Sequence, residues 1–168
     1  MIYCIDSHTF IWAIKEQADE HDAHRLSEAD KFLKWVKAGK HQIMLPTIVL
    51  AECLIKEPPE NHTEILIRAH KTCMVVNFDE RCALKYGELL RLEKWSLAKQ
   101  VQKENDIRRE KMKLDHMILC CALVNGANGI FTEDSELIKF AEPHIKVLSM
   151  PNIGHQEEFV FSEYKTKI

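Results

Sequence analysis

Short apolar runs alternate with longer helical patterns along most of this chain, and this alternation constrains its fold most strongly. The apolar runs cover residues 2–5, 42–45, 74–78 and 129–131, and a weaker fifth run covers 145–149. Such short runs, apolar on both faces, are typical of parallel strands buried between two layers of helices. The sequence therefore predicts an α/β fold, a three-layer α/β/α sandwich built on a parallel sheet.

The length of 168 residues suits a single domain with a sizeable core. We expect this domain to cover residues 1–150, followed by a C-terminal tail at 151–168. Within the domain, residues 93–113 are strongly charged with sparse apolar spacing, which indicates an extended charged helix or arm. The net charge is only −3, so any surface that binds nucleic acid must be locally basic.

The cysteine pattern indicates a reducing compartment. All six cysteines lie within apolar or helical stretches, and none forms a C-x-x-C pair, so we expect buried free thiols. Asp6 interrupts the first apolar run, which argues against a signal peptide, and no stretch reaches the apolar length of a membrane span. These features predict a cytoplasmic protein that has no membrane association.

Four acidic residues each lie beside or within an apolar run. Asp6 follows the first predicted strand, Glu52 lies inside LPTIVLAECLI, Asp115 opens a predicted helix with the sequence DHMILCCALV, and Asp134 follows the fourth strand. A half-buried carboxylate is costly unless a cation neutralises it. Each of these positions falls near the carboxyl edge of the predicted sheet, where ligands bind in such folds. The four acids therefore predict a site for a hard divalent cation and metal-dependent chemistry on phosphate.

Each acid taken alone also has a purely structural explanation. Asp134 suits a helix cap, Asp115 would complement a helix N-terminus, and Asp6 would end a strand in a turn. Glu52 is the hardest to explain in this way because apolar residues flank it on both sides. The joint position of all four at one edge of the sheet favours a functional site.

A group of basic residues precedes the third acid and is expected at the same edge of the sheet. Its members are Arg108, Arg109, Lys111 and Lys113. They are the best candidates for holding the phosphates of a nucleic-acid substrate. An equally good interpretation is that they keep a helix soluble.

At these residues the chain resembles the PIN-domain family of metal-dependent ribonucleases. The matching segments are YCIDSHTFIW (3–12), LPTIVLAECL (45–54), KLDHMILCCALVNGA (113–127) and IFTEDSELIKFA (130–141), and FDERCALKYGELL (78–90) fits more loosely. The resemblance implies a parallel sheet of order 3-2-1-4-5. It also implies that Asp6, Glu52, Asp115 and Asp134 form an acidic pocket, accompanied by the hydroxyls of Ser7 and Thr132.

Many members of this family are VapC-type toxins of toxin–antitoxin pairs. The resemblance therefore implies an endoribonuclease that uses Mg²⁺ or Mn²⁺, acts as a homodimer and is silenced by a small antitoxin protein. Single-stranded RNA is the expected substrate, because its unstacked bases are accessible in an open groove. The main alternative is a catalytically inactive PIN-like protein that binds RNA or serves as a scaffold.

Two phosphate-handling folds with an acidic sheet edge fit less well. Haloacid-dehalogenase-like phosphatases place a second Asp two residues after the first, where this chain has His8. Response-regulator receivers need an acidic pair after the first strand and an Asp after the third. Here Ser7 follows Asp6, and Asp79 is the only nearby acid of the second kind.

Overall fold

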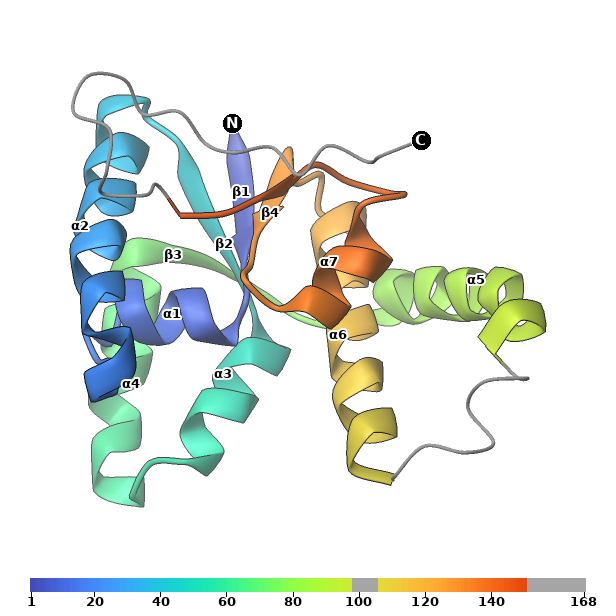
Figure 1. Ribbon diagram of the computed structural model, residues 1–168, viewed down its shortest axis with the longest axis horizontal. Helices are drawn as coiled ribbons and strands as arrows, with labels where there is room; N and C mark the ends of the chain where they lie inside the picture. The colour runs from blue at the N-terminus through green and yellow to red at the C-terminus, as the bar shows by residue number, and fades with distance from the viewer. Residues whose placement is uncertain (98–105, 151–168) are drawn as a thin grey trace.

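The computed structural model is a three-layer α/β/α sandwich (Figure 1), as the sequence predicts. It describes residues 1–97 and 106–150, including their side chains except those of 92–97 and 106–110. The strands are β1 (Ile2–Ile5), β2 (Gln42–Pro46), β3 (Cys73–Val76), β4 (Gly129–Phe131) and β5 (Val147–Leu148). All pair in parallel in the order β3-β2-β1-β4-β5, which confirms the expected 3-2-1-4-5 sheet.

Helices cover both faces of the sheet. They are α1 (Ser7–Ala13), α2 (Ala23–Ala38), α3 (Thr47–Ile55), α4 (Pro59–Thr72), α5 (Glu80–Leu97), α6 (Asp106–Val124) and α7 (Ser135–Ala141), with a short 3₁₀ turn at Glu20–Asp22. In Figure 1, α1, α2 and α4 lie on one side of the sheet, and α5, α6 and α7 lie on the other. Helix α3 packs against both α1 and α6, so it bridges the two layers at the carboxyl edge of the sheet.

The core lies on both faces of the central strands. Ile5, Met44 and Leu45 of the strands are fully buried, as are Phe10 of α1 and Leu119 of α6. All six cysteines are buried and free, as expected from their apolar surroundings. Burial raises the pKa of the Cys53 and Cys73 thiols to about 12, so these thiols stay protonated at neutral pH. They therefore pack as small apolar groups.

One local expectation about a helix start is wrong. Helix α6 begins at Asp106, so Asp115 lies in the middle of the helix and not in its first turn. The residues before Asp115 are mostly good helix formers, and they extend the helix although they lack an apolar stripe.

The predicted charged arm is divided between two helices where the structure describes it. Residues 93–97 end α5 and residues 106–113 begin α6, whereas 98–105 and the predicted tail at 151–168 lie outside the described residues. The division of the chain into domain, arm and tail stays a prediction. Within the described ranges, none of the helices combines the length and the apolar character needed to cross a membrane.

Candidate active site

Asp6 is held rigidly at the carboxyl end of β1. Its carboxylate is 3% exposed, and one oxygen accepts a hydrogen bond from the Thr9 backbone N–H at 2.7 Å, which caps α1. The other oxygen accepts a hydrogen bond at 2.6 Å from the hydroxyl of Thr132, which follows the neighbouring strand β4. Asp6 is thus both a helix cap and the centre of a polar link between the two central strands.

Thr132 and Asp134 follow β4 and are linked to each other. The Thr132 hydroxyl oxygen accepts the Asp134 backbone N–H at 3.0 Å. Asp134 caps α7, and its Oδ1 accepts the N–H groups of Glu136 at 2.9 Å and Leu137 at 3.4 Å. Its Oδ2 lies 2.6 Å from the Lys111 ammonium. One oxygen of Asp134 therefore binds the N-terminus of α7, and the other pairs with the Lys111 ammonium.

Glu52 is positioned by α3 and by the first residue of α1. It is the sixth residue of α3, and it is partly buried. The Ser7 hydroxyl donates a hydrogen bond to its Oε2. Because Ser7 directly follows Asp6, this bond places the second acid beside the first.

Asp115 lies in an unfavourable electrostatic environment. It is 6% exposed, and its Oδ2 has no hydrogen-bond partner among the described residues. Burial and the negative charges of Asp134, Glu52 and Asp6 together raise the pKa of this carboxyl to about 7, although the Lys111 ammonium opposes the rise. All three other predicted acids therefore lie within electrostatic reach of Asp115.

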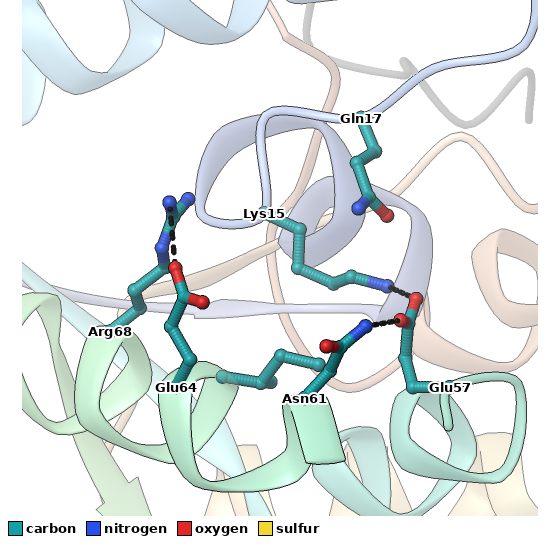
Figure 2. Close-up of a pocket in the computed structure, with 7 residues that line it drawn as sticks. Lys15, Gln17, Glu57, Asn61, Glu64 and Arg68 are labelled. Atoms are coloured by element: carbon teal, nitrogen blue, oxygen red, sulfur yellow. Dashed lines mark hydrogen bonds and ion pairs between the residues drawn. The ribbon is translucent and has the colours of Figure 1, made fainter. Parts of the chain in front are cut away.

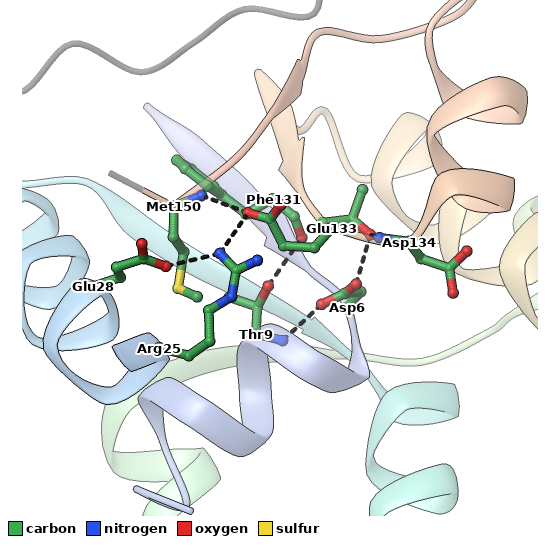
Figure 3. Close-up of polar contacts among 9 residues, drawn as sticks. Asp6, Thr9, Arg25, Glu28, Phe131, Glu133, Asp134 and Met150 are labelled. Carbon is green, nitrogen blue, oxygen red and sulfur yellow. Dashed lines mark hydrogen bonds and ion pairs between the residues drawn. The ribbon is translucent and has the colours of Figure 1, made fainter. Parts of the chain in front are cut away.

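The structure brings the predicted acids to one edge of the sheet, but their carboxylates do not converge on a common point. Figure 3 shows the Asp134 carboxylate pointing away from Asp6. Among the described residues, no group of three His, Cys, Asp or Glu side chains is spaced to hold a metal ion. The donor chemistry nevertheless fits a hard divalent cation, because the available ligands are carboxylate oxygens and the buried Asp115 Oδ2 lacks a partner.

The predicted substrate-binding residues all lie in the first half of α6. The side chains of Arg108 and Arg109 lie outside the described part of the chain. Lys113 is exposed, whereas Lys111 turns toward the acids and pairs with Asp134. Lys111 and Asp115 are four residues apart and share one face of α6, which places the ammonium near the acids but does not indicate its pairing with Asp134.

A second polar cluster, which the sequence analysis missed, fixes the loop after β4. The Arg25 guanidinium donates to Glu28 at 2.8 Å, lies 3.6 Å from Glu133 and sits 5.2 Å from the centre of the Trp12 ring. Glu133 also accepts the Met150 backbone N–H at 3.2 Å (Figure 3). Glu133 thus ties the loop that carries the last acid to α2 and to the end of β5.

A polar cavity of about 150 Å³ lies apart from the four acids, where the end of α1 meets α4 (Figure 2). Its lining consists of Lys15, Gln17, Glu57, Asn61, Glu64, Ile65 and Arg68. Each of its cations lies beside an anion: Lys15 pairs with Glu57, and Arg68 lies 3.1 Å from Glu64. The cavity contains none of the predicted site residues, and its internal ion pairs account for its charges.

The fold is similar to that of chains in three solved VapBC structures. These are VapBC2 from Rickettsia felis bound to a promoter DNA fragment (21% identity, TM-score 0.58), DNA-bound VapBC from Salmonella typhimurium (17%, 0.58) and VapBC-1 from nontypeable Haemophilus influenzae (17%, 0.57). Each match covers 89% of this chain and 98% of the other chain. At these identities the likeness concerns the fold.

The sequence itself matches a known domain family. No significant match was found among curated proteins. The PIN domain family, however, matches residues 3–143, a span that contains all four acids, strands β2, β3 and β4, and all but the first residue of β1. The chain belongs to the PIN domain family.

Proposed function

We propose that this protein is a metal-dependent endoribonuclease that acts in the cytoplasm. PIN domains are generally nucleases, which supports hydrolysis of a phosphodiester bond by this chain. The observation that carries the proposal is the buried Asp115 carboxylate, whose Oδ2 lacks a partner among the described residues and whose charge is opposed by three other acids. A buried carboxyl group in so unfavourable an environment is expected to take part in metal binding or catalysis.

The four acids and two hydroxyls have three kinds of role in this proposal. Asp6 and Asp115 are the expected direct ligands of Mg²⁺ or Mn²⁺, and Glu52 and Asp134 complete the negative charge. When bound, the ion would neutralise the scissile phosphate and lower the pKa of an attacking water. The hydroxyls of Ser7 and Thr132 hold Glu52 and Asp6 in place through their hydrogen bonds. Because the pKa of Asp115 is about 7, occupation of the site by a cation would release a proton from a partly protonated group.

The substrate in this proposal is RNA, most readily single-stranded. We assign its phosphate contacts to Arg108, Arg109, Lys111 and Lys113, which lie on the first half of α6, the helix that carries Asp115. A locally basic segment is needed because the chain as a whole has a net charge of −3. Cations beside the acidic site would hold the backbone without selecting a base sequence.

We also propose that the protein is the toxin of a toxin–antitoxin pair and that it forms a homodimer. The support is the similarity to chains of VapBC complexes from three bacteria. A small antitoxin would then be the natural partner. Copurification of the chain with the product of an adjacent short reading frame would test this role separately from the chemistry.

The chemistry is tested with purified protein and a labelled single-stranded RNA. We expect cleavage in Mn²⁺ or Mg²⁺, no cleavage in EDTA, and loss of at least about 100-fold in rate for Asp115→Asn and for Asp6→Asn. Asp30→Asn is the matched control, because Asp30 is an exposed acid on α2 that pairs only locally with Lys34. Wild-type protein that binds RNA but never cleaves it would contradict the nuclease and support an inactive RNA-binding protein or scaffold.

A further inference from the structure

Lys111 supplies a positive charge to the acidic site from within the chain. Its ammonium lies 2.6 Å from Asp134 Oδ2, and it is placed four residues before Asp115 on the same face of α6. The hydrogen bond to Asp134 raises the pKa of Lys111, which keeps the ammonium charged. The same cation opposes the rise in the pKa of Asp115, so it partly neutralises both acids.

The contact with Asp134 uses the one oxygen that the fold leaves available. Asp134 Oδ1 is committed to the N-terminal N–H groups of α7, at 2.9 Å and 3.4 Å. Any cation that binds Asp134 without unwinding the first turn of α7 must therefore approach Oδ2, where Lys111 already lies. Lys111 and a divalent ion compete for the same atom.

We propose that Lys111 is an exchangeable internal counter-ion, whose ammonium leaves Asp134 Oδ2 when a divalent cation binds the acidic site. This inference rests on the proposed metal-dependent function. Lys111 is a positioning residue here, since it acts through Asp134. A divalent ion would bring twice the charge of the Lys111 ammonium, and Asp115 Oδ2, which has no partner among the described residues, would also hold it.

The two side chains are built for such an exchange. Asp134 is only 10% exposed, so an unpaired charge there would be costly. Lys111 is 52% exposed, and its four-carbon stem lets the ammonium swing into solvent or onto a substrate phosphate at little cost. The ion pair of Lys111 with Asp134 thus stabilises the acidic site before metal binds, and it breaks when metal binds.

Binding of Mn²⁺ to the full-length protein, without RNA, tests the exchange. Mn²⁺ would be titrated into wild type, Lys111→Met and Lys111→Arg, and free Mn²⁺ would be followed by electron paramagnetic resonance. Lys139→Met is the control, because Lys139 is an exposed lysine of α7, the helix that Asp134 caps, and it pairs with Glu136 at 3.1 Å. Circular dichroism of each variant verifies that it is folded.

We expect Lys111→Met to bind Mn²⁺ about two- to fivefold more tightly than wild type, which is the range that loss of one competing ion pair provides. Lys111→Arg should bind like wild type or more weakly, and Lys139→Met should match wild type. Equal or weaker binding by Lys111→Met, with wild-type binding intact, would overturn the exchange alone. Absence of Mn²⁺ binding in every variant would overturn the proposed function and this inference together.

Discussion

Replacing Asp115 by Asn should make the metal-free protein more stable at neutral and alkaline pH, although it should abolish nuclease activity. The carboxylate is 6% exposed, its Oδ2 has no partner among the described residues, and it lies near three other acids. Asn has nearly the same shape and no charge, so the substitution removes the repulsion without creating a cavity. Its amide can also donate a hydrogen bond to a neighbouring carboxylate.

The size of the effect follows from the pKa of Asp115, which burial and the neighbouring acids together raise from 3.8 to about 7. At about 1.4 kcal/mol for each pH unit, this corresponds to an upper bound of about 4 kcal/mol. Water and the half-exposed Lys111 screen the charge, so we expect about 2 kcal/mol. Between pH 4 and 7 the folded state binds this proton and the unfolded state does not, so wild-type stability falls as pH rises through this window.

Urea denaturation in EDTA at pH 5 and pH 8 measures the effect. Fluorescence of the buried Trp12 and the partly buried Trp35 reports unfolding. Asp115→Asn should exceed wild type by about 2 kcal/mol at pH 8 and by much less at pH 5. The exposed Asp30→Asn should differ from wild type by less than about 0.5 kcal/mol at either pH.

Two results would refute this reasoning. Lower stability of Asp115→Asn than of wild type at pH 8 would mean that the carboxylate stabilises the fold through a contact. A stability difference that stays constant from pH 5 to pH 8 would mean that Asp115 titrates in the folded state as it does in the unfolded chain.

Three further perturbations probe the same region. Thr132→Val removes the donor to Asp6 and should cost about 1–3 kcal/mol of unfolding free energy by urea denaturation; an unchanged value would mean that Asp6 finds another donor. Arg25→Met leaves Glu28 as a buried unpaired acid and should lower the unfolding free energy by about 2–3 kcal/mol. Adding Glu28→Gln to this variant should recover part of that loss, and additive losses would contradict the pairing. Mn²⁺ at 100 times its dissociation constant should stabilise wild type by about 2.7 kcal/mol in thermal melts, and it should stabilise Asp115→Asn far less. Equal stabilisation of the two proteins would mean that the ion binds away from Asp115.

The fold was largely predictable because its determinants are local. Each strand is a short apolar run, and the confirmed parallel order follows from the family resemblance that the motifs around Asp6, Glu52, Asp115 and Asp134 carry. The start of α6 was not predictable from apolar periodicity, because residues 106–113 are helical without an apolar stripe. There, intrinsic helix propensity and tertiary packing determine the structure.

The position of the four acids at one edge of the sheet was predictable, whereas the directions of their side chains were predictable only in part. The rule that ligands bind at the carboxyl ends of parallel strands placed all four acids at one edge. The direction of each side chain depends on partners far apart in sequence, such as Thr132 for Asp6 and Lys111 for Asp134. A single sequence does not encode these distances in any local pattern, so the pairing of Lys111 with Asp134 was missed.

In the proposed function, the four carboxylates hold one or more divalent cations. Anomalous X-ray scattering from Mn²⁺-soaked crystals of the full-length protein tests this claim most directly. We predict a manganese peak within about 2.0–2.3 Å of oxygens from Asp6 and Asp115, with the ammonium of Lys111 withdrawn from Asp134. Well-ordered crystals that show manganese only at other positions, with Lys111 still paired to Asp134, would contradict it.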